Sequence, residues 1–429
     1  MGWRHIDAHQ RNVPLLLVCQ TLTTLCMMTL VPIMPLYVAS LSPAGLPGDP
    51  DTLMRWANVA LAAPGLGALC CAPFAGRWCD RYGYRRMLLV SLAVFIASVV
   101  LIALSTNLAC FIAGRWLQGA SAIGLVLTAF IGRAGDDSVR GRNLGLQESA
   151  IGAGALLGPV IGGAVLDYWS LRPMLLATAL FTAIAAALLW LCTSEPRAGD
   201  RAAESKPRPR PDRDSAAGIR PSPSSVQAHE FRGLATVMRH PELRRWMLAG
   251  CLTQAAGFAM LTVFALYISA RFPALHAPGS IIGSLHALGW LATIVAGPVW
   301  GRLNDRGKVR RHFAIAAATC ALSSALLMAA NALWAIALLR LIQGACYAAL
   351  TQSMLLACLR QLPASVHGHV TGLGRGFMTA GQLLGPMLVI ACAPLLAPRQ
   401  LPWLVAALFL MAGLLVWRPA GRALPLHHI

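Results

Sequence analysis

The chain has 429 residues, of which 57% are hydrophobic and only 12% are charged, about half the charged fraction of an ordinary soluble protein. A water-exposed fold cannot bury this much apolar surface, so a soluble protein is excluded and a membrane protein is expected. Strand-like alternation of apolar and polar residues is absent, which leaves helices as the spanning elements. The net charge of +19 would suit a nucleic-acid-binding protein, and the positions of the basic residues decide against that class.

Twelve apolar stretches of about 20 residues are long enough to cross a bilayer as helices. In chain order they lie at Val13–Leu41, Trp56–Ala75, Met87–Ser105, Leu108–Ile131, Gln147–Tyr168, Pro173–Cys192, Trp246–Ser269, Ser280–Trp300, Phe313–Ala330, Leu333–Leu359, Gly374–Leu396 and Leu401–Trp417. The predicted fold class is therefore an all-α integral membrane protein with twelve transmembrane helices.

The basic residues indicate the orientation. If both termini are cytoplasmic, 29 of the 35 Lys and Arg residues fall in cytoplasmic segments. The outer loops then hold only Arg55, Arg172, Arg271 and Arg399. This asymmetry follows the positive-inside rule, so a multi-pass protein with both termini in the cytoplasm is predicted. It also accounts for the net charge without nucleic acid as a partner.

Residues 193–245 differ in composition from the rest of the chain. They are rich in Pro, Ser and charged residues, and such a segment can bury little apolar surface. We therefore expect a flexible cytoplasmic linker at 193–245 between two six-helix bundles, residues 1–192 and residues 246–429.

The two halves repeat in sequence. Three segments recur: GRWCDRYGYRR (Gly76–Arg86) as GRLNDRGKVRR (Gly301–Arg311), RWLQGA (Arg115–Ala120) as RLIQGA (Arg340–Ala345), and GAGALLGP (Gly152–Pro159) as TAGQLLGP (Thr379–Pro386). The offsets of 225, 225 and 227 residues keep nearly one register. Two pseudo-symmetric halves are typical of transporters in which one half rocks against the other around a central site.

With these motifs the chain resembles the major facilitator superfamily, and within it the twelve-span drug-proton antiporters, over nearly its whole length outside the linker. The loop motif GxxxDRxGxRR is matched by Gly76, Asp80, Arg81, Gly83, Arg85 and Arg86; the fourth-span motif RxxQG by Arg115, Gln118 and Gly119; and the fifth-span antiporter motif by Gly154, Gly158, Pro159, Gly162 and Gly163. The resemblance implies a monomeric, proton-coupled exporter of small organic molecules in the bacterial plasma membrane, acting by alternating access.

The resemblance also implies a cytoplasmic latch between the halves. Its residues would be those of the loop motif together with Asp305, Arg302, Arg306 and Arg375. A carboxylate such as Asp80 at a helix C-terminus needs a nearby cation, which the loop arginines supply. Because the family packs the fifth span on the eighth and the second on the eleventh, we expect bridges from Glu148 to Arg302 or Arg306 and from Asp80 to Arg375. A loop that only sets topology, and a Glu148 that faces cytoplasmic water, are the alternatives.

Two arginines lie deep within spans, where an unpaired cation is costly. By resemblance Arg115 helps to couple proton movement to transport, and Arg340 is its repeat. Alternatively, each binds backbone carbonyls or Gln118 and Gln343. The membrane-embedded acid that many such antiporters carry in the first or fourth span is absent. The candidate proton carriers are therefore Glu148, then Asp80, then His286, whose imidazole suits the task but could equally be a packing residue.

The fifth-span glycines allow another helix to approach closely, and Pro159 bends the span. This face either seals the cavity against proton leak, as the resemblance implies, or serves packing alone.

The resemblance implies that the first, seventh, eighth and tenth spans line the substrate cavity. Polar and aromatic residues of these spans, together with Gln118 of the fourth, are therefore its candidate wall, with packing as the alternative. They are Gln20, Thr24, Gln118, Gln254, Tyr267, Trp290, Arg340, Tyr347 and Gln352. Without an acid to attract lipophilic cations, the buried arginines favour neutral, zwitterionic or anionic cargo such as a siderophore.

Three functions remain open: multidrug efflux, dedicated export of a siderophore or other metabolite, and import of a nutrient on the same fold. HExxH, GxSxG, GxxxxGK[ST] and metal-ligand patterns are absent from the sequence, so neither an enzyme nor a cofactor or metal is expected.

Overall fold

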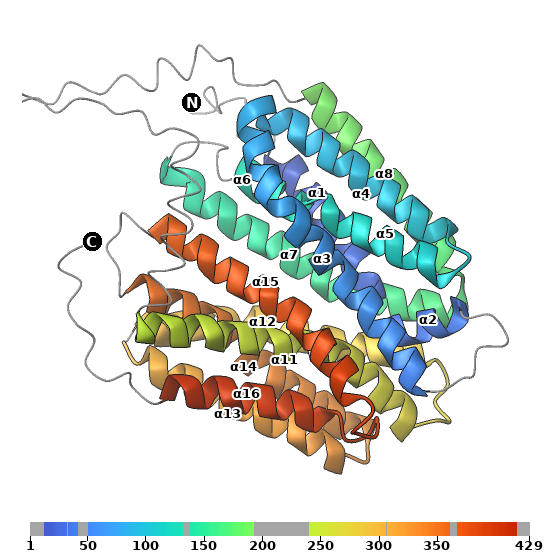
Figure 1. Cartoon of the computed structure of the whole chain (residues 1–429), viewed down its shortest axis with the longest axis vertical. Coiled ribbons are helices and arrows are strands. Elements are labelled where there is room, and N and C mark those ends of the chain that lie inside the picture. The colour runs from blue at the N-terminus through green and yellow to red at the C-terminus, as the bar shows by residue number, and fades with distance from the viewer. Residues whose placement is uncertain are drawn as a thin grey trace, which may run out of the picture.

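The structure is a computed structural model that describes residues 13–31, 33–41, 50–131, 137–192, 240–305, 307–360 and 367–417. These residues form helices joined by short turns (Figure 1). Nine of the spans in this part of the chain are, by length and composition, long and apolar enough to cross a membrane.

The first half contains α1 (Val13–Leu30), α2 (Met34–Leu41), α3 (Pro50–Tyr82), α4 (Tyr84–Leu104), α5 (Leu108–Ala120), α6 (Ile123–Ile131), α7 (Asp137–Tyr168) and α8 (Leu171–Cys192). Two predicted spans are each divided between two helices: the first between α1 and α2, and the fourth between α5 and α6. The second break lies at Ser121–Ala122, where Ala122 has a φ of 49°. L-residues other than Gly rarely adopt this conformation, so the chain is strained at that point.

The second half contains α11 (Pro241–Arg271), α12 (Pro278–Asp305), α13 (Val309–Leu326) with the 3₁₀ turn η2 (Leu327–Ala329), α14 (Leu333–Leu359), α15 (His367–Cys392) and α16 (Pro402–Trp417). Here each predicted span has one helical counterpart. The helix α14, which corresponds in the repeat to α5 and α6 together, runs without a break. The ends of the other helices differ from the predicted ones by a few residues, because the helices extend into the polar flanks.

Each half has its own apolar core. One buried cluster runs from Leu16 to Leu189 and the other from Leu243 to Val416. Figure 1 shows the blue-to-green helices and the yellow-to-red helices as two bundles side by side. Large apolar side chains such as Phe181 and Leu414 are exposed on the outside, as expected for surfaces that face lipid. Residues 193–239 lie outside the described part of the chain, so the linker and the domain limits stay predictions.

Glycines bring the helices together in the same way in both halves. A Cβ atom at Gly154 of α7 would lie 2.8 Å from the carbonyl oxygen of Thr21 in α1. In the second half, a Cβ atom at Gly381 or Gly385 of α15 would collide with the backbone of α11. The fifth-span packing is therefore duplicated on the eleventh, and the predicted pseudo-symmetry has a structural counterpart.

The two halves meet through α7 with α12 and through α3 with α15, as the resemblance implied. A Cβ atom at Gly283 of α12 would collide with the Pro159 carbonyl of α7, and one at Gly65 of α3 with Leu383 of α15. We call the end of the bundles at which α3 and α12 terminate, near Gly83 and Gly307, the basic end, and the other the opposite end.

Candidate functional site

The first buried arginine, Arg115 of α5, is 1% exposed. Its Nη1 donates to Oε1 of Gln118 at 2.5 Å and its Nε to the carbonyl oxygen of Ala60 in α3 at 3.3 Å. Residues three apart on a helix lie on one face, which places Gln118 within reach of the guanidinium. Arg115 thus binds a backbone carbonyl and Gln118, which are the contacts expected of an arginine with a structural role. Its role in coupling proton movement to transport stays a prediction.

The second buried arginine, Arg340 of α14, repeats this arrangement and adds a histidine. Its guanidinium donates to Gln343 and also lies 3.0 Å from Nδ1 of His286 in α12. It lies 5.0 Å from the ring centroid of Phe264, a cation–π distance. Because an arginine can only donate, Nδ1 of His286 must accept, so the imidazole is neutral with its proton on Nε2. Protonation of Nδ1 would break this contact.

In the first half, a glutamine network joins α1, α6 and α7. The Nε2 atom of Gln147 donates to Oε1 of Gln20 at 3.0 Å and to the hydroxyl of Thr128 at 2.8 Å. Gln20 in turn donates to the hydroxyl of Thr24 at 3.0 Å. Gln20 and Thr24 were predicted to line a cavity. Gln147 and Thr128 were missed, although polar side chains within apolar spans could have indicated them.

The second half has a matching glutamine network on the corresponding spans. Gln382 of α15 donates to Oε1 of Gln254 in α11 at 3.3 Å, and Gln254 donates to the hydroxyl of Thr351 in α14 at 3.3 Å. Gln254 was predicted, whereas Gln382 and Thr351 were missed. The two networks thus place amide and hydroxyl groups on corresponding spans of both halves, although in the repeat register Gln382 corresponds to Ala155 and not to Gln147.

The remaining cavity candidates have different surroundings. Tyr267 is buried in the core of the second half, where its hydroxyl donates to the carbonyl of Leu327 in η2. Tyr347 is half-buried with its ring edge-on to Phe409, at 6.2 Å between centroids. Trp290 is half-buried and Gln352 is exposed. Tyr267 therefore has the contacts of a packing residue.

A contact that the sequence analysis missed joins the two halves at the opposite end. Asp167, in the last turn of α7, accepts hydrogen bonds from the backbone N–H groups of Gly279, at 2.9 Å, and Ser280, at 2.5 Å. A carboxylate is disfavoured at the C-terminal end of its own helix, but the positive N-terminal end of α12 compensates it here. We call Asp167, Gly163, Gly279 and Ser280 the clasp.

The glycines of the clasp permit this approach. A Cβ atom at Gly279 would lie 2.8 Å from the Gly163 carbonyl oxygen, and one at Gly163 would collide with the backbone of α12. At the basic end, by contrast, a Cβ atom at Gly301 or Gly376 meets no described atom within 4 Å. The backbones of the two halves are thus in close contact at the opposite end.

The predicted latch at the basic end is described only in part. Gly76, Asp80, Glu148 and Asp305 are described as helix backbone alone, and Arg306 lies outside the described residues. The expected bridges from Glu148 to Arg302 or Arg306 and from Asp80 to Arg375 therefore stay predictions.

The described latch residues lie at the surface of the basic end. Arg86, Arg302 and Arg375 are exposed. Gly83 has a φ of 89°, which a glycine adopts readily and other residues rarely do, so the turn before α4 requires it. Arg81 lies 5.3 Å from the ring centroid of Tyr82, and Arg85 donates to the carbonyl of Trp190 at the end of α8.

Comparison with protein families agrees with this architecture. The model of the Major Facilitator Superfamily matches residues 16–273 and 272–427, which covers nearly all of the chain. The chain belongs to the major facilitator superfamily. Members of this superfamily are transporters, so the protein is a multi-pass membrane transporter and not an enzyme.

Relatives within the superfamily are distant. The Staphyloferrin B transporter of Staphylococcus aureus is 26% identical over 381 residues, which are 88% of this chain and 85% of the relative. The multidrug resistance protein MdtG of Salmonella arizonae is 23% identical over 400 residues, 91% of each chain. A solved bacterial homologue of the human lysosomal transporter Spinster, in an inward-facing and unoccupied conformation, has the same fold, with a TM-score of 0.72 at 12% identity over 96% of this chain and 97% of the other.

Proposed function

We propose that this transporter exports small organic molecules in exchange for protons, by alternating access, from the plasma membrane of a bacterial cell. The observation that carries the proposal is the packing of α7, whose glycines and Pro159 contact both α1 and α12. At these described positions the close packing leaves little room for water between α7 and its neighbours, and an exchanger driven by a proton gradient requires such packing to limit proton leak. The basic end faces the cytoplasm in this proposal, because the basic residues of the chain concentrate there.

The proton carrier that we propose is Glu148. It lies within the fifth predicted span, where an ionisable residue is costly and is a functional candidate by default, and it follows Gln147, a member of the buried network of the first half, in the chain. His286 is the weaker candidate, because its Nδ1 is occupied by Arg340.

The cargo that we propose is oxygen-rich and neutral or anionic, of the siderophore class. Among the side chains that the structure describes, the only carboxylates are Asp167 and Glu242, and neither pairs with Arg115 or Arg340. The buried cations therefore disfavour lipophilic cations, and the two glutamine networks offer donors to hydroxyl and carboxyl oxygens. The likeness to the Staphyloferrin B transporter supports this class.

Broad drug efflux is the second candidate. The likeness to MdtG, which extends over 91% of both chains, favours it.

The test uses inverted vesicles that contain the protein and carry an imposed pH gradient. Cationic dyes, neutral antibiotics, and hydroxamate, catecholate and carboxylate siderophores are added in turn, and collapse of the gradient is followed by fluorescence. Collapse with one siderophore class alone supports the dedicated exporter, and collapse with many unrelated compounds supports drug efflux. Silence throughout, or uptake into right-side-out vesicles without proton movement, contradicts proton-coupled export.

Two variants make the test specific. Glu148→Gln should abolish the proton flux while substrate binding persists. Glu242→Gln removes an acid that pairs with Arg310 at the basic end, and it should keep the flux. Equal loss in both variants contradicts a carrier role for Glu148.

A further inference from the structure

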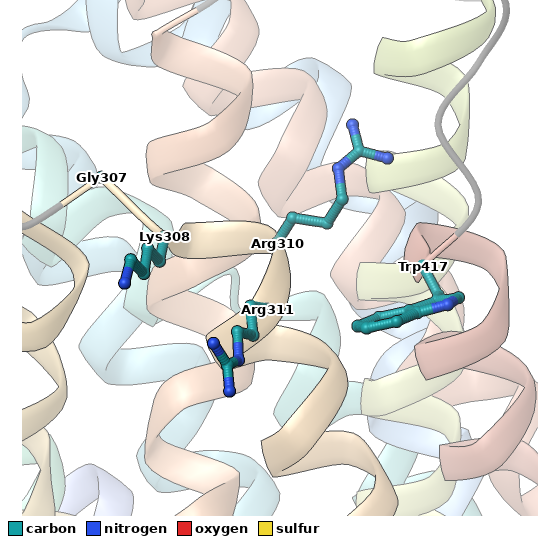
Figure 2. Close-up of a pocket in the computed structure, with 5 residues that line it drawn as sticks. All are labelled: Gly307, Lys308, Arg310, Arg311 and Trp417. Carbon is teal, nitrogen blue, oxygen red and sulfur yellow. The ribbon is translucent and has the colours of Figure 1, made fainter.

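A pocket of about 310 Å³ lies at the basic end of the second half, on α13 and α16 and away from the contacts of α7 with α12 and of α3 with α15. It is lined by Gly307, Lys308, Arg310, Arg311 and Trp417. Figure 2 shows the Trp417 indole ring extending from the end of α16 toward the first turn of α13. The pocket thus joins the start of one membrane span to the end of another.

The pocket carries unneutralised positive charge. Arg310 is paired with Glu242 of α11 and also donates to the Val416 carbonyl oxygen at 2.9 Å. The side chains of Lys308 and Arg311 are exposed and have neither a hydrogen bond nor an ion pair with any described residue. In Figure 2 both point away from Arg310. Two cations are therefore available to an anion.

The backbone adds to this preference. Lys308 precedes the first residue of α13, and no side chain caps the N–H groups of that first turn. Uncapped N–H groups at a helix N-terminus favour an anion, and here they coincide with two cations and a cavity.

Apolar surface continues directly from the pocket. Ile315 and Leu322 follow Arg311 on one face of α13, and Leu414 and Leu410 precede Trp417 on one face of α16; all four are exposed. The helices α13 and α16 pack side by side. A tryptophan at the end of a span is typical of the membrane–water interface, so the cations lie at headgroup depth and the leucines and isoleucine at acyl-chain depth.

We propose that this pocket binds the phosphate-bearing headgroup of an anionic phospholipid, with Lys308 and Arg311 contacting the phosphate and the outer faces of α13 and α16 contacting the acyl chains. Basic pockets between transmembrane helices select such headgroups. The proposal requires only that the chain crosses a membrane, so it is independent of proton coupling and of the cargo.

Native mass spectrometry of the purified full chain tests the proposal by counting bound lipid during titration with phosphatidylglycerol, phosphatidylcholine or inorganic phosphate. Lys308→Gln/Arg311→Gln should weaken phosphatidylglycerol binding about 30-fold, which is about 2 kcal/mol, since each cation near a lipid surface contributes about 1 kcal/mol. Arg311→Lys, which keeps the charge, should bind nearly as the wild type does. Phosphatidylcholine should bind weakly to every variant.

The matched control removes two charges at the opposite end, through Arg55→Gln/Arg399→Gln; both arginines are exposed. It should bind phosphatidylglycerol as the wild type does. If the control weakened phosphatidylglycerol binding equally, the effect would come from the net charge of the protein and not from this pocket, and the proposal would be overturned. Competition by inorganic phosphate at the same concentration as the lipid would also overturn it, because the site would then recognise a free anion. If the double variant does not fold, Lys308→Gln alone should give about a fivefold loss.

Discussion

Removing the carboxylate of Asp167 should open the transporter at the opposite end. The clasp consists of two hydrogen bonds from α12 backbone N–H groups to a carboxylate, at 2.9 and 2.5 Å. Bonds to a charged group contribute about 1.5 to 3 kcal/mol each when buried, and because Asp167 is half-exposed we take about 1 kcal/mol each. Asp167→Ala should thus shift the equilibrium toward opening by about 2 kcal/mol, or about 30-fold. Asp167→Asn keeps one acceptor oxygen and should shift it about fivefold.

The assay measures the distance between spin labels at positions 169 and 395, one in each half at the opposite end, in a chain freed of its 12 cysteines. The native residues there, Trp169 and Leu395, are exposed. Asp167→Ala should increase the long-distance population. The matched control is Arg172→Ala, because Arg172 donates to the carbonyl oxygen of Ser105 within its own half, at 3.3 Å. An unchanged distance distribution in Asp167→Ala, or an equal shift in the control, would refute the reasoning.

Three further experiments test the packing, a buried hydrogen bond and the ion pair. Gly163→Ala should slow transport at least about tenfold, because its Cβ atom has no room against α12. Gly124→Ala, whose Cβ atom meets no described atom within 4 Å, should transport normally, and equal rates in the two variants would argue against the close approach. Gln118→Leu removes an acceptor from a buried guanidinium and should lower the free energy of unfolding by about 2 to 3 kcal/mol, so a melting temperature like that of the wild type would contradict it. A double-mutant cycle on Glu242 and Arg310, whose side chains are 14% and 35% exposed, should give a coupling of about 1 kcal/mol; a value of zero would show that the pair is incidental.

The sequence was sufficient for the features that depend on neighbours along one helix or on the repeat. The spans follow from apolar length, and the Arg–Gln contacts follow from a spacing of three residues in RWLQGA and RLIQGA. The fifth-span glycines indicated close packing, because a residue without a Cβ atom lets a neighbouring helix approach closely in any helix. The contact of α7 with α12 came from the family resemblance.

Features that depend on two distant segments could not be predicted in this way. Asp167 and Gly279 are 112 residues apart, and only the approach of the two halves brings them together. The contact of Arg340 with His286 has no equivalent in the first half, where Leu61 occupies the corresponding position, so the repeat gave no indication of it. The break after α5 was missed because an uninterrupted apolar stretch without proline reads as one helix.

That break is one of two by which the first half differs from the second, in which the corresponding spans, α11 and α14, are each one helix. In the first half the fourth span has a joint at Ala122, with strained backbone beside it. In the second half the corresponding position, Tyr347, lies inside the continuous helix α14. A span that is interrupted between two helices bends at a lower energetic cost than one continuous helix does. We therefore expect the first half to bend during the transport cycle while the second moves as a rigid body, so that two halves with the same repeated sequence pattern play unequal mechanical parts.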